Sequence, residues 1–181
     1  MKLPATVLIT GASGGIGAAL ARCYAAPART LILHGRDPAR LAARARDCEA
    51  RGARVVSTSF DLRDGAAAVA ALRQLSGAHM IDLVIVNAGV SSMIGGGEEV
   101  ENWETSRAVL AVNLDGALAT VAGVLPVNEH RVELSLVLHP TTLCDQSGDL
   151  GGEGCLPFGR CNHPAGRGLG RGRRRFARLP T

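Results

Sequence analysis

A glycine-rich segment near the N-terminus is the part of the sequence best suited to chemistry. It reads TGASGGIG over residues 10–17 and lies between an apolar run and an Ala/Leu-rich stretch. A turn from a strand into a helix of this kind points backbone N–H groups and the positive helix end at a pyrophosphate. Glycine is needed where a Cβ would block the approach of the backbone to the phosphate or to the next strand. We therefore predict a dinucleotide-binding loop, with a purely structural turn as the alternative.

The elements that must position this loop follow from alternating patterns in the first 126 residues. We expect strands over residues 5–10, 30–34, 54–60 and 81–86, and helices over 16–25, 38–50, 64–75 and from 99 or 102 to about 125. Asp37 before Pro38 is typical of a helix start, and Gly52 of a helix end. Such alternation predicts an α/β fold, a doubly wound parallel sheet of the Rossmann type.

Further motifs stand where the predicted strands and the last helix would carry them. Asp61-Leu62 follows the third strand, Asn87-Ala88-Gly89 ends the fourth strand, and Asn113 lies in the long helix. Together with Gly11, Gly15 and Gly17, which match the pattern TGxxxGxG, they resemble the short-chain dehydrogenase/reductase (SDR) family. The resemblance covers residues 5–126, about two thirds of the chain.

This resemblance implies an oxidoreductase that transfers hydride between a nicotinamide cofactor and a small alcohol or carbonyl substrate. It implies that Asp61 contacts the adenine ring, that the Asn87 motif steadies the sheet beside the cofactor, and that Asn113 holds a proton-relay water as a catalytic residue. The expected cofactor-binding residues are Gly11, Ser13, Gly15, Ile16, Gly17, Arg36, Asp61, Leu62, Asn87, Ala88 and Gly89.

The end of the second predicted strand indicates which cofactor is used. An acidic residue there would bind a ribose 2′-hydroxyl and favour NAD, whereas an arginine would pair with a 2′-phosphate and favour NADP. The sequence at this point is HGRD, with Arg36 followed by Asp37. We therefore expect NADP in preference to NAD. The alternative is that Arg36 is a solvated loop residue and Asp37 only a helix cap.

The chemistry that the SDR family places beyond its asparagine is missing from this sequence. The family uses a serine, a tyrosine and a lysine four residues after the tyrosine, because a phenol with a pKa near ~10 needs a cationic neighbour to act near neutrality. The chain has one tyrosine, Tyr24, one lysine, Lys2, and no YxxxK segment. Ser135, Thr141 or Thr142 could stand near the serine position. The alternative to an enzyme is thus a non-catalytic dinucleotide-binding fragment.

The sequence changes character after Pro126. Residues 131–138 could form a fifth strand, but from His139 onward no helical or strand period is sustained and glycine and arginine are frequent. We predict a Rossmann domain over residues 1–138 and a poorly ordered tail over 139–181, so that the fold is incomplete. One hypothesis is that a truncation or a shifted reading frame of a GC-rich gene follows residue 126. The other is a genuine divergent tail.

Charge and cysteine spacing argue against further sites in that tail. Residues 127–181 carry eight Arg and five acidic groups, against 12 basic and 11 acidic groups in residues 1–126. The basic run 166–178 could bind nucleic acid, but its single aromatic residue and lack of an RGG repeat favour a solvated tail. Three cysteines and two histidines could be drawn as a zinc site, yet their spacing fits no common one, so no metal is expected. These residues are His139, Cys144, Cys155, Cys161 and His163.

Location and assembly can be expected only in general terms. No apolar run reaches the ~18 residues of a membrane span, the N-terminus shows no signal-peptide pattern, and the five cysteines include no CxxC pair. We therefore expect a cytoplasmic protein with no membrane contact. The family resemblance makes a homo-oligomer possible through the helix that contains Asn113 and the helix after it. The sequence does not identify the substrate.

Overall fold

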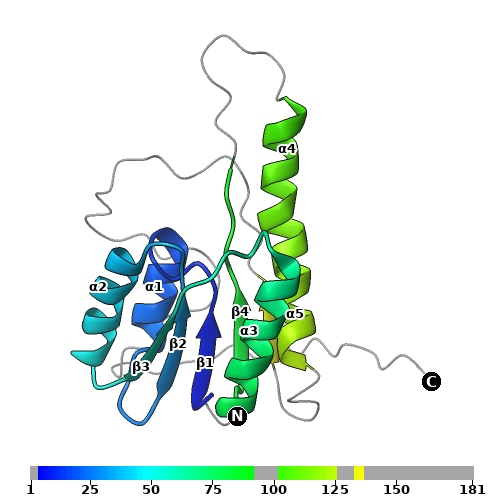
Figure 1. Cartoon of the computed structure of the whole chain (residues 1–181). Helices are drawn as coiled ribbons and strands as arrows, with labels where there is room; N and C mark the ends of the chain where they lie inside the picture. Colours follow the sequence, from blue (N-terminus) through cyan, green and yellow to red (C-terminus); the bar gives the residue numbers. More distant parts are fainter. Residues whose placement is uncertain (1–3, 92–101, 126–132, 137–181) are drawn as a thin grey trace, which may run out of the picture. The chain divides into compact units, whose positions relative to one another are not determined.

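The computed structural model describes residues 4–91, 102–125 and 133–136 of the chain (Figure 1). The predicted tail and the domain boundary after residue 138 lie outside these residues. The elements are β1 (Thr6–Ile9), α1 (Gly15–Tyr24), β2 (Thr30–His34), α2 (Pro38–Glu49), β3 (Arg54–Thr58), α3 (Gly65–Ala78), β4 (Leu83–Val86), α4 (Trp103–Leu110), a π-helical turn η1 (Ala111–Asp115), α5 (Gly116–Val124) and β5 (Glu133–Leu136).

The described strands form one parallel sheet in the order β3-β2-β1-β4-β5. The chain first builds outward from β1 to β3 and then returns to the other side of β1 with β4. In open α/β sheets this reversal separates the loops that follow the two adjacent strands and leaves a crevice at their carboxyl ends. The predicted doubly wound parallel sheet is confirmed, and its reversal point lies between β1 and β4.

The two faces of the sheet bury separate cores, because alternate residues of each strand point to opposite sides. Val7 and Ile9 pack in one cluster with Ala21 of α1 and Leu41 of α2. Leu8, between them, packs in a second cluster that includes Leu72 of α3 and Val124 of α5, and Figure 1 shows α3 and α5 side by side. Helices therefore cover both faces, which is why the inner strands β1, β2 and β4 are largely apolar rather than alternating.

Three helices begin at polar residues whose side chains accept from the first turn. Asp37 accepts from Arg40 N at 3.0 Å, Asp64 from Ala67 N at 3.1 Å, and Asn102 from Thr105 N at 2.9 Å. The predicted start of α2 is confirmed, and of the two predicted starts of the long helix the structure uses Asn102. Helix α3 extends to Ala78, three residues beyond its predicted end. Ser76 in its last turn is buried, so packing outweighs a weak local preference.

The segment Trp103–Val124 is long and apolar enough to cross a membrane by length and composition alone. Its C-terminal part, α5, packs on α3 and contributes Val124 and Ala119 to the buried clusters. Packing against α3 thus accounts for the buried residues, which make up 33% of the segment's apolar window.

The contact between α3 and α5 is close enough for glycine to matter. A Cβ on Gly123 would lie 2.5 Å from Leu72 Cβ, whereas a Cβ on Gly77 of α3 would meet nothing within 4 Å. We expect Gly123→Ala to destabilise the protein by about 1–2 kcal/mol through overpacking. Gly77→Ala should stabilise it by up to about 1 kcal/mol, since alanine is the better helix former. Urea unfolding measures both, and equal effects would contradict the packing argument.

Candidate functional site

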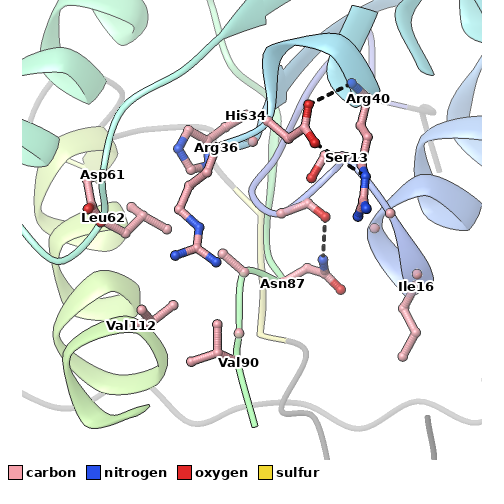
Figure 2. Close-up of a pocket in the computed structure, with 18 of the residues that line it drawn as sticks. Ser13, Ile16, His34, Arg36, Arg40, Asp61, Leu62, Asn87, Val90 and Val112 are labelled. Atoms are coloured by element: carbon pink, nitrogen blue, oxygen red, sulfur yellow. Dashed lines mark hydrogen bonds and ion pairs between the residues drawn. The ribbon is translucent and has the colours of Figure 1, made fainter. Parts of the chain in front are cut away.

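A cavity lies at the carboxyl ends of β1, β2 and β4, where the sheet reverses direction (Figure 2). All eleven residues predicted to bind a cofactor line it, so the structure brings them together from four separate loops. The cavity is lined by Gly11, Ser13, Gly14, Gly15, Ile16, Gly17, His34, Gly35, Arg36, Asp37, Arg40, Asp61, Leu62, Asn87, Ala88, Gly89, Val90, Ser91 and Val112. Eight of these were not predicted as cofactor-binding residues, namely Gly14, His34, Gly35, Asp37, Arg40, Val90, Ser91 and Val112.

The glycine loop packs directly on the segment that follows β4. Gly11 has φ +70°, and a Cβ there would lie 2.8 Å from Ala88 Cα. A Cβ on Gly17 would lie 2.6 Å from Asn87 Nδ2 and would overlap the carbonyl oxygen of Gly11. Both glycines are therefore required by close approach of backbone to backbone, which is the role that the sequence motif predicts.

Hydrogen bonds of Thr10 and Asn87 hold the ends of β1 and β4 together. The Thr10 hydroxyl oxygen accepts from the backbone N–H groups of Asn87 and Ala88, both at 3.0 Å. In return, Asn87 Nδ2 donates to the carbonyl oxygens of Thr10 at 3.0 Å and Gly11 at 3.4 Å. Thr10 and Asn87 are both buried, so these bonds are shielded from competing water. Asn87 thereby steadies the sheet beside the cavity.

Two polar atoms at the cavity have no hydrogen-bond partner among the described residues, namely Asn87 Oδ1 and His34 Nδ1. Buried polar atoms are normally paired, so an unpaired one beside a cavity indicates a place for a ligand or water donor. His34 itself is held by its Nε2, 3.0 Å from the Phe60 carbonyl oxygen, and its ring lies 4.2 Å from the Phe60 ring. Burial lowers the pKa of His34 below 6.5, so it is neutral at pH 7.

The loop after β2 places two arginines at the cavity. Arg36 lines it directly. Arg40, in the first turn of α2, also lines it and forms an ion pair with Asp37 through its Nε at 3.3 Å. A side chain at Gly35, before Arg36, would be tightly packed, because a Cβ there would lie 3.0 Å from Ser13 Cβ and 3.3 Å from Leu41 Cδ1. This end of the cavity therefore carries two positive charges, from Arg36 and Arg40, and one negative charge, from Asp37.

Asp61 after β3 is paired with Arg63. Its carboxylate accepts from Arg63 Nε at 2.9 and 3.1 Å, from Arg63 Nη2 at 2.5 Å, and from the Arg63 backbone N–H at 2.9 Å. The side-chain hydrogen bonds from Arg63, followed by the backbone bond, lower the pKa of Asp61 from 3.8 to about 2. Asp61 is therefore ionised at the mouth of the cavity at any physiological pH.

Asn113, the predicted catalytic residue, binds the backbone of the segment after β4. Its Oδ1 accepts from Val90 N at 2.8 Å, and its Nδ2 donates to Val90 O at 2.9 Å. Asn113 lies in η1, where the helix takes an extra residue in one turn, a feature found often at functional sites. Its side chain thus fixes Val90, which lines the cavity. The predicted water-holding role stays a prediction.

The single tyrosine lies away from the cavity. Tyr24 ends α1, whereas Gly15 at the start of α1 lines the cavity, and a ten-residue helix is about 15 Å long. Arg29 donates to the Tyr24 carbonyl oxygen at 2.8 Å and stacks its guanidinium 5.9 Å from the ring centre. Tyr24 therefore lies at the end of α1 that is remote from the cavity. Lys2, Thr141 and Thr142 lie outside the described residues. No cluster of three or more His, Cys, Asp or Glu occurs in the described part.

The Asp61–Arg63 pair can be tested by titration. Since the folded pKa of Asp61 is depressed, its stabilising contribution is present above about pH 4 and is lost as the pH falls through about 2. Replacing Arg63 with Gln should raise the pKa of Asp61 toward 3.8, measured from the pH dependence of its carboxyl carbon NMR shift. Arg73→Gln, on α3, serves as the control and should leave that value unchanged. A value near 2 in the Arg63 variant would contradict the pairing.

Comparison with known proteins agrees with this arrangement. A family model described as short chain dehydrogenase matches residues 5–132. An uncharacterised oxidoreductase of Myxococcus xanthus is 35% identical over 135 residues, which are 73% of this chain and 52% of that protein. The chain thus spans about half the length of these curated relatives.

Solved structures show the same relationship. A metagenomic short-chain oxidoreductase in complex with NADP matches with a TM-score of 0.66 and 30% identity, covering 72% of this chain and 60% of that chain. A 3-oxoacyl-[acyl-carrier protein] reductase with bound NAD from Brucella melitensis matches with a TM-score of 0.63 and 29% identity, covering 72% and 52%. The family match, the parallel sheet and the glycine loop closed on Asn87 lead to one conclusion: the chain belongs to the short-chain dehydrogenase family of oxidoreductases.

Proposed function

We propose that the protein is an NADP(H)-dependent oxidoreductase that transfers hydride between the nicotinamide ring and an alcohol or carbonyl substrate. In this proposal the present chain supplies the cofactor-binding half of the enzyme. The observation that carries it is the position of the glycine loop. The loop packs against Asn87 at the reversal point of the sheet and lines a cavity that is also lined by two arginines. The substrate class follows from the family alone.

The start of α1 fits a pyrophosphate. The first N–H groups of a helix have no partner within the helix, and α1 has neither a side-chain cap at Gly14 nor an acidic residue in its first turn. A Cβ on Gly14 or Gly15 would meet nothing within 4 Å, so the backbone is open on the cavity side. Free N–H donors together with the positive helix end favour an anion at this place.

The other end of the cavity fits an adenosine that carries a 2′-phosphate. Asp61 and Leu62 line it after β3, where an adenine ring would bind, and Arg36 lines it after β2. An acidic side chain at Gly35, which would favour a ribose 2′-hydroxyl, would be crowded by Ser13, because a Cβ there would lie 3.0 Å from Ser13 Cβ. Arginine pairs well with phosphate through charge-assisted hydrogen bonds. These contacts support NADP in preference to NAD.

The residues of this chain have limited roles in the reaction itself. When bound, NADP(H) supplies or accepts the hydride. The N–H groups at the start of α1 would hold its pyrophosphate, Gly11, Gly17 and Asn87 would keep that loop in place, and Asn113 would fix the wall at Val90. The tyrosine and lysine that the family uses for proton transfer are not supplied by Tyr24 or Lys2. This observation favours, as the second candidate, a fragment that binds NADP without turnover.

The test compares binding and turnover in the full chain. We expect NADPH to bind more tightly than NADH, and Arg36→Ala to weaken NADPH binding by about tenfold, the equivalent of one charge-assisted hydrogen bond, with little effect on NADH. Nucleotide fluorescence measures binding, and loss of NADPH absorbance with a panel of aldehydes and ketones measures turnover. Binding without turnover would support the second candidate. No binding of either nucleotide would contradict the proposed function.

We also propose a homo-oligomer, because α4, η1 and α5 expose an apolar row. Trp103, Leu110, Leu114 and Leu118 recur at helical spacing and are all at least half exposed. Apolar rows of this kind are usually buried by a partner. Sedimentation equilibrium should show a self-association that Leu114→Glu weakens, whereas Met80→Glu, an exposed residue before β4, should not change it. A monomeric wild type would contradict this proposal.

A further inference from the structure

Arg40 lines the cavity but belongs to none of the sequence motifs that mark the site. We propose that Arg40 is a second ligand for the 2′-phosphate of NADP(H), in addition to Arg36, and that the cap formed by Asp37 fixes the backbone of Arg40. This inference rests on the proposed function, since it assigns a specificity-determining residue to the same site.

The two oxygens of Asp37 have separate tasks. Its Oδ1 accepts from the backbone N–H of Arg40 at 3.0 Å and so caps helix α2. Its Oδ2 lies 3.3 Å from Arg40 Nε, and Figure 2 shows both contacts as dashed lines. The first contact fixes the backbone at Arg40, and the second directs its side chain along the edge of the cavity. Asp37 therefore restrains Arg40 at the cavity when no ligand is bound.

Three residues with hydrogen-bond donors line the cavity near the loop that follows β2. Ser13 comes from the loop after β1, Arg36 from the loop after β2, and Arg40 from the first turn of α2. Gly35 brings the first two loops together, because its missing side chain lets Ser13 Oγ approach to 3.1 Å from where a Cβ would lie. Two guanidiniums and a hydroxyl match a phosphate dianion, whereas a ribose hydroxyl could not neutralise two positive charges.

The ion pair between Arg40 and Asp37 does not prevent this role. The side chains of Arg40 and Asp37 are 75% and 47% exposed, and an ion pair at such a site contributes little to stability. Arg40 can therefore turn toward a dianion while Asp37 keeps its cap through Oδ1. The charge of Asp37 also repels the phosphate. Removing that charge without losing the cap should strengthen NADPH binding, since asparagine is an equally good capping residue.

Helix α2 contains a matched control. Arg44, one turn after Arg40, forms the same kind of ion pair three residues apart, with Asp47 at 3.1 Å, and its side chain is 36% exposed. Arg44 does not line the cavity. Replacing either arginine with alanine removes one positive charge and one surface ion pair from the same helix. Only the Arg40 change removes a group at the cavity.

The experiment measures the dissociation constants of NADPH and NADH for the full chain by nucleotide fluorescence, at low and at moderate salt. We expect Arg40→Ala to weaken NADPH binding by about tenfold with a less than twofold effect on NADH. Arg44→Ala should change neither. Asp37→Asn should tighten NADPH binding several-fold, and added salt should reduce the difference between the Arg40 variant and the wild type.

The outcomes separate this inference from the proposed function. If Arg40→Ala and Arg44→Ala affect NADPH equally while Arg36→Ala removes the preference for NADPH, the role of Arg40 is wrong and the proposed function stands. If Asp37→Asn weakens NADPH binding, the expected repulsion between the Asp37 carboxylate and the 2′-phosphate is wrong. If the wild type binds neither nucleotide, the proposed function fails and this inference fails with it. Thermal unfolding of each variant checks that the fold is kept.

Discussion

The site depends on the contact between the end of β1 and the end of β4. Thr10 and Asn87 exchange hydrogen bonds there in a buried setting, and Gly11 and Gly17 leave the space that this contact requires. A parallel sheet brings the carboxyl ends of its strands to one edge, but it does not by itself set the distance between two loops. The Thr10–Asn87 bonds set that distance. The start of α1 then faces a cavity instead of packing against the sheet.

Much of this arrangement could be predicted from the sequence, because the motifs depend on local backbone requirements. A Gly11 with positive φ, a cap at Asp37 and an apolar run such as that of β4 are all local properties that the residue types express. All eleven predicted cofactor-binding residues line one cavity for the same reason. Their roles toward a ligand stay predictions, as do the domain boundary and the tail.

Features that depend on tertiary contacts could not be predicted in the same way. The pairing of Asp61 with Arg63 needs a loop conformation that two charges near each other in sequence do not specify. The unpaired Nδ1 of His34 follows from burial beside Phe60, and Asn113 reaches Val90 across a gap of 23 residues. Neither the burial of His34 nor the contact between Asn113 and Val90 produces a recognisable spacing of residue types in the sequence. The position of Arg40 in the cavity could have been found, since a basic residue in the first turn after Arg36 is visible in the sequence.

The π-helical turn η1 has a consequence for how this helix tolerates changes in length. A π turn holds one residue more than an α turn, so the faces of α4 and α5 are out of phase by about 100° relative to one continuous α-helix. Deleting a single residue within Ala111–Asp115 would restore a regular helix and turn the whole of α4 about its axis. Asn113 would then leave Val90, and the exposed row on α4 would no longer line up with that on α5. The extra residue thus sets the register between the cavity wall and the outer surface of the protein.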